Sequence, residues 1–486
     1  MLYKIDREFV VFIAIIALCV VFFFSIHGDF IVGLDNPAYT EPAINFLIGK
    51  GFTSTSWYAQ GNKSFWAGNV PLHQFILIPW LKFTGISFVS VITLNYIFVL
   101  SSAALIWTAL RKSCLIATPQ WRLACIFCLL STSTTYSLLT EGRYESLGLA
   151  ICGAGAVFFT TKRPFVRRLG LFVTAALLPW THLAITVFAA LTIILLLLFY
   201  GKLYWRECLV FAFGGCFGAL ALVVFYFYMG VLNAFFLSIA PHSQVITHNQ
   251  PISKAPQFGG YWKPELDYIL VAVGVAGFAV LCFIRGMAIR FPLFIIANML
   301  FILVAIAKLG KLSPYYGWML LFSPAVFLFA ALSKVPLPKK ISVAVCCGFA
   351  LIGVMLPGSL FRKTIKSRIL FAKQGSITEN INKFALSVTS QDDTAWVNPI
   401  FYYSLKQHVK VIITEPAGFG YYNWFPVIRY PGEEDDMKAV TVCLWRDTDI
   451  SRQHLSWLPG EWNPTGEVFT LNNLSYYVYR RDHTHE

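Results

Sequence analysis

The sequence predicts a polytopic α-helical membrane protein of about eleven transmembrane helices, with a small C-terminal α/β domain outside the membrane. Three observations support this fold class. Of the 486 residues, 57% are hydrophobic and only 13% charged, whereas soluble domains carry about 25% charged residues. Apolar runs such as 89–109 and 209–228 have about the ~20 residues that cross a bilayer as a helix. The last part of the chain, in contrast, is polar.

Polar or basic residues separate the expected spans from one another. The first span follows Lys4 and Arg7 and has no small-residue cleavage pattern after it, so we expect a retained signal anchor. Two later spans are separated by the break Pro179-Trp180-Thr181-His182. The full set of expected spans is 9–27, 87–110, 121–139, 145–161, 167–180, 183–200, 207–230, 267–284, 290–307, 315–333 and 341–360.

The basic residues predict how the chain is oriented. With the N-terminus inside, sixteen Lys and Arg residues fall at cytoplasmic ends and eight in outer loops, which is the pattern of the positive-inside rule. The net charge of +14 therefore does not indicate nucleic acid as a partner; membrane lipids are the expected partner. An odd number of spans then places the C-terminal part outside, facing the periplasm or exterior of a bacterial inner or plasma membrane.

Two domains are expected. A transmembrane domain (1–360) has two large outer loops, 28–86 and 231–266. The extracytoplasmic domain (361–486) contains a helix that begins with the capping box Ser376-Ile377-Thr378-Glu379, with Ile377, Ile381 and Phe384 facing inward. Its expected strands are 395–397, 409–414, 439–444 and 476–479.

An acidic motif follows the first span. Asp35 and Glu41 lie on either side of Tyr39, and Pro42 is well placed to begin a short helix over 42–48, which glycines at 49 and 51 would end. The apolar side of this helix predicts that it lies flat in the outer membrane interface. Two carboxylates are thus expected near the membrane surface.

This arrangement resembles the C-type (GT-C) membrane glycosyltransferases, in particular the protein O-mannosyltransferases and the lipid A aminoarabinose transferase. These enzymes share an acidic motif after the first span, followed by Tyr, Glu, a Gly and later Pro-Leu. Tyr315-Tyr316 followed by Pro324 is similar to a Tyr…Pro pattern late in their membrane domain. The positions that match the acidic motif here are Asp35, Asn36, Tyr39, Glu41, Gly51 and Pro71-Leu72.

The resemblance implies a GT-C-like fold and a glycosyltransferase. It would move a hexosyl or pentosyl unit from a polyprenyl-phosphate donor to a lipid, glycan or protein acceptor on the outer face. Asp35 is the expected general base, with Glu41 as a second catalytic carboxylate. Two positions depart from the family. Asn36 replaces the second acid, which leaves a divalent cation without support, and Gly68-Asn69-Val70 lacks the Lys that relatives place before Pro-Leu.

Other polar residues at outer helix ends could bind the donor phosphate. Arg143 lies in a tight turn and could bind phosphate, or it could form a salt bridge with Glu141 or Glu145. Tyr39 and His182 could contact substrate, or could be an interfacial anchor and a residue of a solvated turn. Lys308, Lys311 and Tyr315 lie around the turn between two late spans. They could bind an anionic lipid head group, or the lysines could simply snorkel to the membrane interface at helix ends.

Three other functions compete with the enzyme. A transporter or flippase for an amphiphilic or lipid-linked solute would need charged residues near the middle of several spans, and these spans are nearly free of charge there. A polysaccharide polymerase or ligase would rest on a later loop larger than 231–266. A scaffold role for the outer domain would fit a degenerate motif. No ATP- or NAD-binding motif is present in the sequence.

Overall fold

The computed structural model describes most of the chain. Two sequence predictions lie almost wholly outside the described residues: the span 267–284 and the loop 231–266 beyond its first few residues. The described residues are 6–25, 35–55, 64–68, 71–140, 142–236, 238, 274, 276, 277, 290–308, 317–355, 359–414, 438–446, 460–471 and 474–481.

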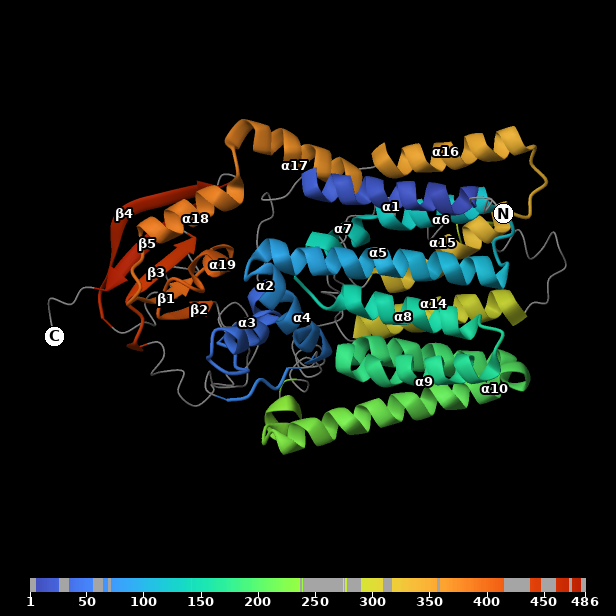
Figure 1. Ribbon diagram of the computed structural model, residues 1–486, viewed down its shortest axis with the longest axis horizontal. Coiled ribbons are helices and arrows are strands. Elements are labelled where there is room, and N and C mark those ends of the chain that lie inside the picture. The colour runs from blue at the N-terminus through green and yellow to red at the C-terminus, as the bar shows by residue number, and fades with distance from the viewer. Residues whose placement is uncertain are drawn as a thin grey trace, which may run out of the picture.

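A bundle of long helices forms the larger part of the molecule (Figure 1). The N-terminus lies at one end of this bundle, and the short helices α2–α4 and a β-sheet lie at the other. The bundle helices are α1 (Arg7–Ser25), α5 (Phe88–Ser113), α6 (Pro119–Ser131), α7 (Ser133–Thr140), α8 (Glu145–Phe159), α9 (Pro164–Thr181), α10 (Leu183–Tyr228), α14 (Arg290–Lys308), α15 (Gly317–Leu332) and α16 (Lys339–Met355).

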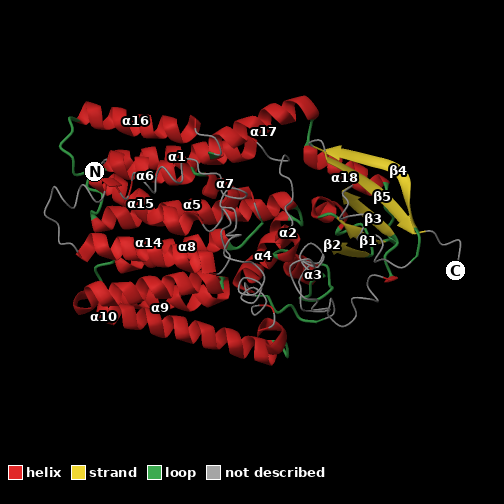
Figure 2. Cartoon of the chain, turned by 180° about the vertical axis from the view of Figure 1, so that it is seen from behind, coloured by secondary structure: helices red, strands yellow, loops and turns green. Residues whose placement is uncertain are grey.

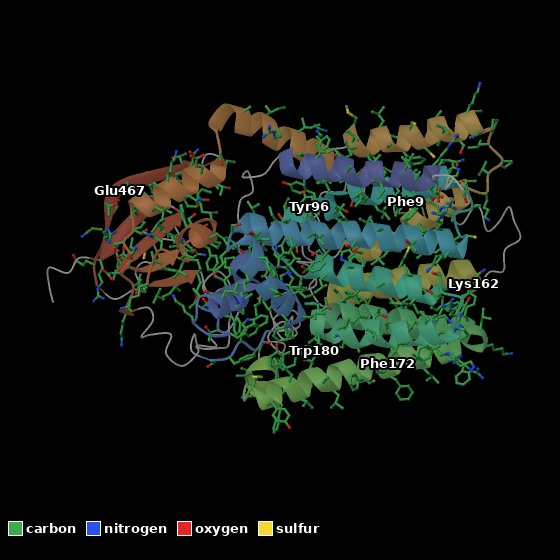
Figure 3. All side chains as sticks on the ribbon, viewed as in Figure 1. Phe9, Tyr96, Lys162, Phe172, Trp180 and Glu467 are labelled. Carbon is green, nitrogen blue, oxygen red and sulfur yellow. The ribbon has the colours of Figure 1, made fainter. Side chains whose placement is uncertain are left out.

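Length and composition show which described helices could cross a membrane. Two of them, α5 and α10, pass on their own. Up to four spans result if α6 with α7, and α16 with the start of α17 (Leu360–Gln374), each form one bent span. The chain is a helical membrane protein. The number of eleven spans and the N-in orientation stay predictions. Lys162 lies at the end of the bundle opposite to Glu467 of the sheet (Figure 3).

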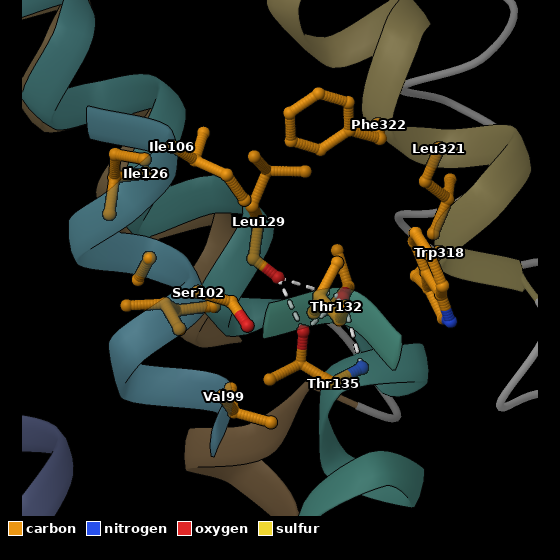
Figure 4. A pocket seen from close by; sticks show the side chains of 13 residues that line it. Val99, Ser102, Ile106, Ile126, Leu129, Thr132, Thr135, Trp318, Leu321 and Phe322 are labelled. Atoms are coloured by element: carbon orange, nitrogen blue, oxygen red, sulfur yellow. Dashed lines mark hydrogen bonds between the residues drawn. The ribbon is translucent and has the colours of Figure 1, made fainter. Parts of the chain in front are cut away.

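The predicted span 121–139 consists of two helices, α6 and α7, with a bend of 58° between them. Thr132 has extended backbone at the break, and its Oγ1 accepts the amide of Thr135 at 3.2 Å. The Thr135 hydroxyl in turn donates to the Leu129 carbonyl at 2.7 Å (Figure 4). Hydroxyl side chains thus satisfy backbone groups that a continuous helix would pair. A cavity of about 40 Å³ lies beside the break.

The predicted spans 183–200 and 207–230 are confirmed as two helices within α10, joined at Tyr200, whose backbone is not helical (φ −134°, ψ 20°). The second of them packs against α9 through glycines. A Cβ at Gly218 would lie 2.0 Å from the carbonyl oxygen of Ala176, so only glycine permits this close approach. The predicted break near 179–182 is also confirmed, since α9 ends at Thr181 and His182 is extended.

A mixed five-stranded sheet forms the core of the C-terminal sheet domain, which we define as residues 377–481 (Figure 2). Its strand order is β2-β1-β3-β5-β4, with β1 parallel to β2 and β3, and β5 antiparallel to β3 and β4. The elements are α18 (Ile377–Ser387), β1 (Thr394–Val397), the 3₁₀ turn Pro399–Phe401, α19 (Tyr402–Leu405), β2 (Val411–Thr414), β3 (Val442–Arg446), β4 (Trp462–Leu471) and β5 (Leu474–Arg481).

Sequence patterns found most of this domain. All four predicted strands exist, and Ser376 accepts the Glu379 amide at 3.2 Å as the capping box predicts. The Glu379 carboxylate pairs with Lys383 in the next turn instead of returning to the cap. The sequence missed β4, whose side chains are mostly exposed, and α17 (Leu360–Gln374), which leads from the bundle to the sheet domain.

Three short helices connect the bundle to the sheet domain: α2 (Asp35–Ala38), α3 (Glu41–Leu47) and α4 (Pro71–Thr84). The helix predicted over 42–48 is α3, and left-handed backbone at Gly49 (φ 79°) follows its end. The apolar side of this helix was predicted to lie in the membrane interface. This is wrong for Ile44, which is fully buried in the protein. Ile44 belongs to one hydrophobic cluster with Leu77 of α4 and Phe401 of the sheet domain, so this side of α3 packs inside the protein.

A buried ion pair holds α1 to the bundle at its N-terminal end. The Arg122 guanidinium contacts both Glu8 carboxylate oxygens, at 2.6 and 2.8 Å, and Trp107 Nε1 donates to the same carboxylate at 2.8 Å. Both charged side chains are less than a tenth exposed. A neighbouring pair, Asp6 with Arg111, is about two-fifths exposed.

We expect Arg122→Met to lower the free energy of unfolding by about 3–5 kcal/mol, because it leaves the Glu8 carboxylate buried without its cation. Denaturant unfolding in detergent micelles measures the change. Asp6→Asn is the matched control and should have little effect, because solvent screens that pair. Equal effects of the two substitutions would contradict the assignment.

Candidate active site

One hydrogen bond brings the acidic motif to the turn between α7 and α8. The Asn36 side-chain oxygen accepts the amide of Gly142 at 3.0 Å, and Asn36 is 1% exposed. A Cβ at Gly142 would lie 2.8 Å from a methyl group of Val91, so the turn approaches this closely only with glycine. Asp35 is the first residue of α2 and immediately precedes Asn36. Asp35 therefore begins a helix that is bound to the turn carrying Arg143.

Three predicted site residues, Tyr39, Arg143 and His182, form an aromatic and cationic cluster with Tyr144. We call these four residues the Tyr39–His182 cluster. The Tyr39 and Tyr144 rings meet edge to face at 4.8 Å, and Tyr144 stacks on His182 at 4.5 Å. The Arg143 guanidinium carbon lies 4.8 Å from the centre of the Tyr39 ring. Residues from the turn after α2, the α7–α8 turn and the α9–α10 junction thus meet at one place.

Arg143 forms the salt bridge with Glu145 that the sequence left open. Its guanidinium nitrogens lie 2.7 and 3.1 Å from the Glu145 carboxylate, and both residues are buried. This ion pair and the two tyrosine rings fix the plane of the guanidinium. Phosphate binding by Arg143 stays a prediction.

His182 caps the second helix of its pair. Its Nδ1 accepts the amide of Ala184 at 3.0 Å, which satisfies one of the donors at the start of α10. Because Nδ1 is the acceptor, the proton of the neutral ring is on Nε2. His182 is 2% exposed and therefore lies within protein rather than in a solvated turn. A substrate contact by this residue is untested.

Glu41 lies in a buried ion pair. Its side chain is fully buried, and Lys406 of the sheet domain contacts it at 2.5 Å. Ser54 Oγ and the Thr55 amide both donate to Oε2 at 2.8 Å, and Thr55 Oγ1 lies 3.0 Å from Oε1. Each carboxylate oxygen therefore has protein partners. The catalytic role expected for Glu41 is untested, and its surroundings suit a carboxylate that holds structure together.

Two residues of α4 support the same segment and were not predicted. Gln74 accepts the Ala43 amide at 3.1 Å and donates to the Tyr39 carbonyl, so it connects α2 with α3. His73 is fully buried, and neither ring nitrogen has a hydrogen-bond partner among the described residues. The only signal in the sequence is that these two polar residues interrupt the apolar run 71–81.

Burial changes the acid–base behaviour of His73, which lies in α4, outside the expected membrane spans. Burial lowers the pKa of His73 to about 4, and the Tyr39 backbone acts in the opposite direction. The folded protein therefore holds this ring neutral at pH values where an unfolded histidine is protonated.

The other predicted positions lie at the margin of the described structure. Lys308 is the last residue of α14, while Lys311 and Tyr315 lie outside the described residues. In the stretch 68–70, only Gly68 is described. A Cβ on Gly68 would overlap the Trp66 ring, and Tyr226 donates to the Gly68 carbonyl. Within the described ranges, no group of three or more His, Cys, Asp or Glu is arranged to hold a metal ion.

A cavity of about 220 Å³ lies beside this site, between the start of α5 and the sheet domain. Ser87, Phe88 and Tyr403 line it, together with Asn382 and Ser404. The Tyr403 hydroxyl also bonds Thr40 Oγ1 at 2.7 Å, so the cavity is adjacent to the link between α2 and α3.

The sequence matches no protein-family model and no curated protein. Among solved structures, the chain is similar to ArnT from Cupriavidus metallidurans, determined with bound undecaprenyl phosphate. The TM-score is 0.57 at 12% identity, over 97% of this chain and 98% of that one. The mycobacterial arabinofuranosyltransferase AftD gives a TM-score of 0.45 at 14% identity, over 98% of this chain and 40% of that one. The likeness to ArnT confirms the predicted GT-C-like fold.

We expect acid to destabilise the protein through His73. Since the folded pKa of about 4 is below the unfolded value of about 6.5, this contribution is complete above pH 6.5 and is lost as pH falls toward 4. The loss should be about 3 kcal/mol. Thermal unfolding in detergent between pH 7.5 and 4.5 measures it for wild type and His73→Phe.

The difference between the two proteins isolates His73 from other titrating groups. His73→Phe should have a smaller acid-induced fall in Tm than wild type. His408→Gln, which changes a histidine of the sheet domain that contacts the Thr389 carbonyl, should keep the larger fall. Parallel curves for wild type and His73→Phe would contradict the prediction.

Proposed function

We propose that this protein is a glycosyltransferase that moves a sugar from a polyprenyl-phosphate donor to an acceptor hydroxyl at the end of the bundle that carries α2–α4. The observation that carries the proposal is the hydrogen bond between Asn36 and Gly142. It joins the helix that begins with Asp35, the expected base, to the turn that carries Arg143, the expected phosphate ligand. The fold shared with ArnT, whose structure contains undecaprenyl phosphate, supports the same assignment.

In the proposed reaction, the acceptor oxygen attacks the anomeric carbon and the bond from that carbon to the phosphate oxygen breaks. Asp35 takes the proton of the acceptor hydroxyl. The products are the glycosylated acceptor and polyprenyl phosphate. A single carboxylate suffices for such a displacement, because the leaving group is a phosphate and needs stabilisation of charge rather than protonation. Asn36 then has a structural task, since its side chain holds the Gly142 amide.

Arg143 is the proposed contact to the phosphate. Its guanidinium has five donors in a planar arrangement that suits a phosphate, and Nε and one Nη bind Glu145. Tyr39 and His182 complete this proposal as substrate contacts, because they adjoin Arg143 and Tyr144 in the cluster. Lys308, Lys311 and Tyr315 are proposed for the lipid head group. The N-in orientation would place all of these residues at the outer face.

Purified protein in liposomes with a panel of polyprenyl-phosphate sugars tests the proposal. We expect wild type to release polyprenyl phosphate in the presence of an acceptor, and Asp35→Asn to be slower by a factor of about 10²–10⁴, the usual contribution of a general base. Asn36→Ser is a matched polar change at the next residue and should lose less activity.

Two results would contradict the proposal. Equal release by wild type and Asp35→Asn would remove Asp35 from the chemistry. No release with any common donor and acceptor would contradict a glycosyltransferase function. Solute uptake by the same liposomes would then favour a transporter or flippase. Formation of long glycan chains would instead favour a polymerase or ligase.

A further inference from the structure

We infer that the C-terminal sheet domain positions the acidic motif through Lys406, so that the site is complete only when this domain is bound to α2 and α3. This inference rests on the proposed function for its effect on activity. Lys406 is separated from Glu41 by 365 positions in the chain, yet their side chains form a buried ion pair.

Among the described residues, four of the first loop make polar contacts with the sheet domain. Besides Glu41 with Lys406, Thr40 Oγ1 lies 2.7 Å from the Tyr403 hydroxyl, and Thr55 Oγ1 lies 3.0 Å from the Ile412 carbonyl oxygen. At the rim, Lys50 Nζ donates to the Lys410 carbonyl at 2.8 Å. The contacts come from α19 and the start of β2, which are neighbours in the sheet domain. We call this set the Glu41–Lys406 clamp.

The clamp acts on the segment that bears the proposed base. Thr40 and Glu41 follow Asp35 by five and six positions, and Thr40 Oγ1 also donates to the Asn36 carbonyl at 2.8 Å. Movement of α19 away from α3 would therefore release the end of α2 that Thr40 holds, while Asn36 would stay bound to Gly142. Because reacting groups must be placed to within about 1 Å, such a release would lower the rate even though no clamp residue contacts substrate.

Burial makes the ion pair sensitive to the loss of one partner. Burial lowers the pKa of Lys406, and the Glu41 carboxylate opposes this effect. A buried carboxylate without its cation is poorly tolerated, whereas removal of both charges leaves no unpaired charge. Removal of Lys406 alone should therefore loosen the contact much more than removal of both charges. An ordinary packing contact would not produce this difference.

The test compares Lys406→Met, the double variant Glu41→Gln/Lys406→Met, and Lys410→Met as the matched exposed lysine. Hydrogen exchange of peptides covering 36–47 needs no substrate. We expect exchange at least about tenfold faster in Lys406→Met, and near wild-type exchange in the other two variants. In the liposome assay, kcat of Lys406→Met should fall roughly 10–100-fold with little change in KM for the donor, and the double variant should recover most of it.

Three results would overturn the inference. Unchanged exchange in Lys406→Met would show that the clamp does not hold α2 and α3. Faster exchange with unchanged kcat would show that the clamp does not position the site. Restored exchange without restored kcat in the double variant would assign Glu41 to the chemistry itself.

Two safeguards keep the test decisive. If Lys406→Met does not fold, Tyr403→Phe removes only the hydroxyl that bonds Thr40, and should give a smaller increase in exchange confined to 36–47. If wild type shows no sugar transfer, the proposed function fails, while the exchange experiment still supports or overturns the clamp.

Discussion

The ion pair between Glu41 and Lys406 is the interaction on which the arrangement of this end of the molecule depends. It joins a loop that follows the first helix to a domain near the end of the chain, with both charges buried. Such a pair gives little net stability compared with apolar residues, but its loss on one side is costly. It therefore specifies one relative placement of sheet domain and first loop, and the apolar cluster of Ile44, Leu77 and Phe401 supplies the packing around it.

Local patterns predicted much of the fold. The break at Tyr200, the break at His182 and four of the five strands followed from apolar runs and polar punctuation. Hydropathy could not predict the bend between α6 and α7, because a threonine such as Thr132 is also found inside apolar spans. Only the structure shows that its hydroxyl accepts the Thr135 amide in place of a backbone carbonyl. Strand β4 was missed since its exposed side chains lack the alternation that marks a half-buried strand.

The candidate site was predicted in its parts but not in its connections. Sequence placed Tyr39, Arg143 and His182 at helix ends, and the structure brings them together around Tyr144. Lys406 and Gln74 could not be found this way. Their partners are distant in the chain, and a lysine in a polar tail has no pattern that marks it as buried. The pairing of Arg143 with Glu145 was likewise shown only by three-dimensional geometry, and Glu141 lies outside the described residues.

The most direct measurement of the central claim is a structure in lipid nanodiscs with bound polyprenyl phosphate. Our account places the phosphate beside Arg143, close to the start of α2 and within the Tyr39–His182 cluster, with the lipid chain running along the bundle. A phosphate bound elsewhere would contradict it, most clearly at the opposite end of the bundle near Lys162. Equal binding of polyprenyl phosphate to wild type and to Arg143→Ala would also contradict our account.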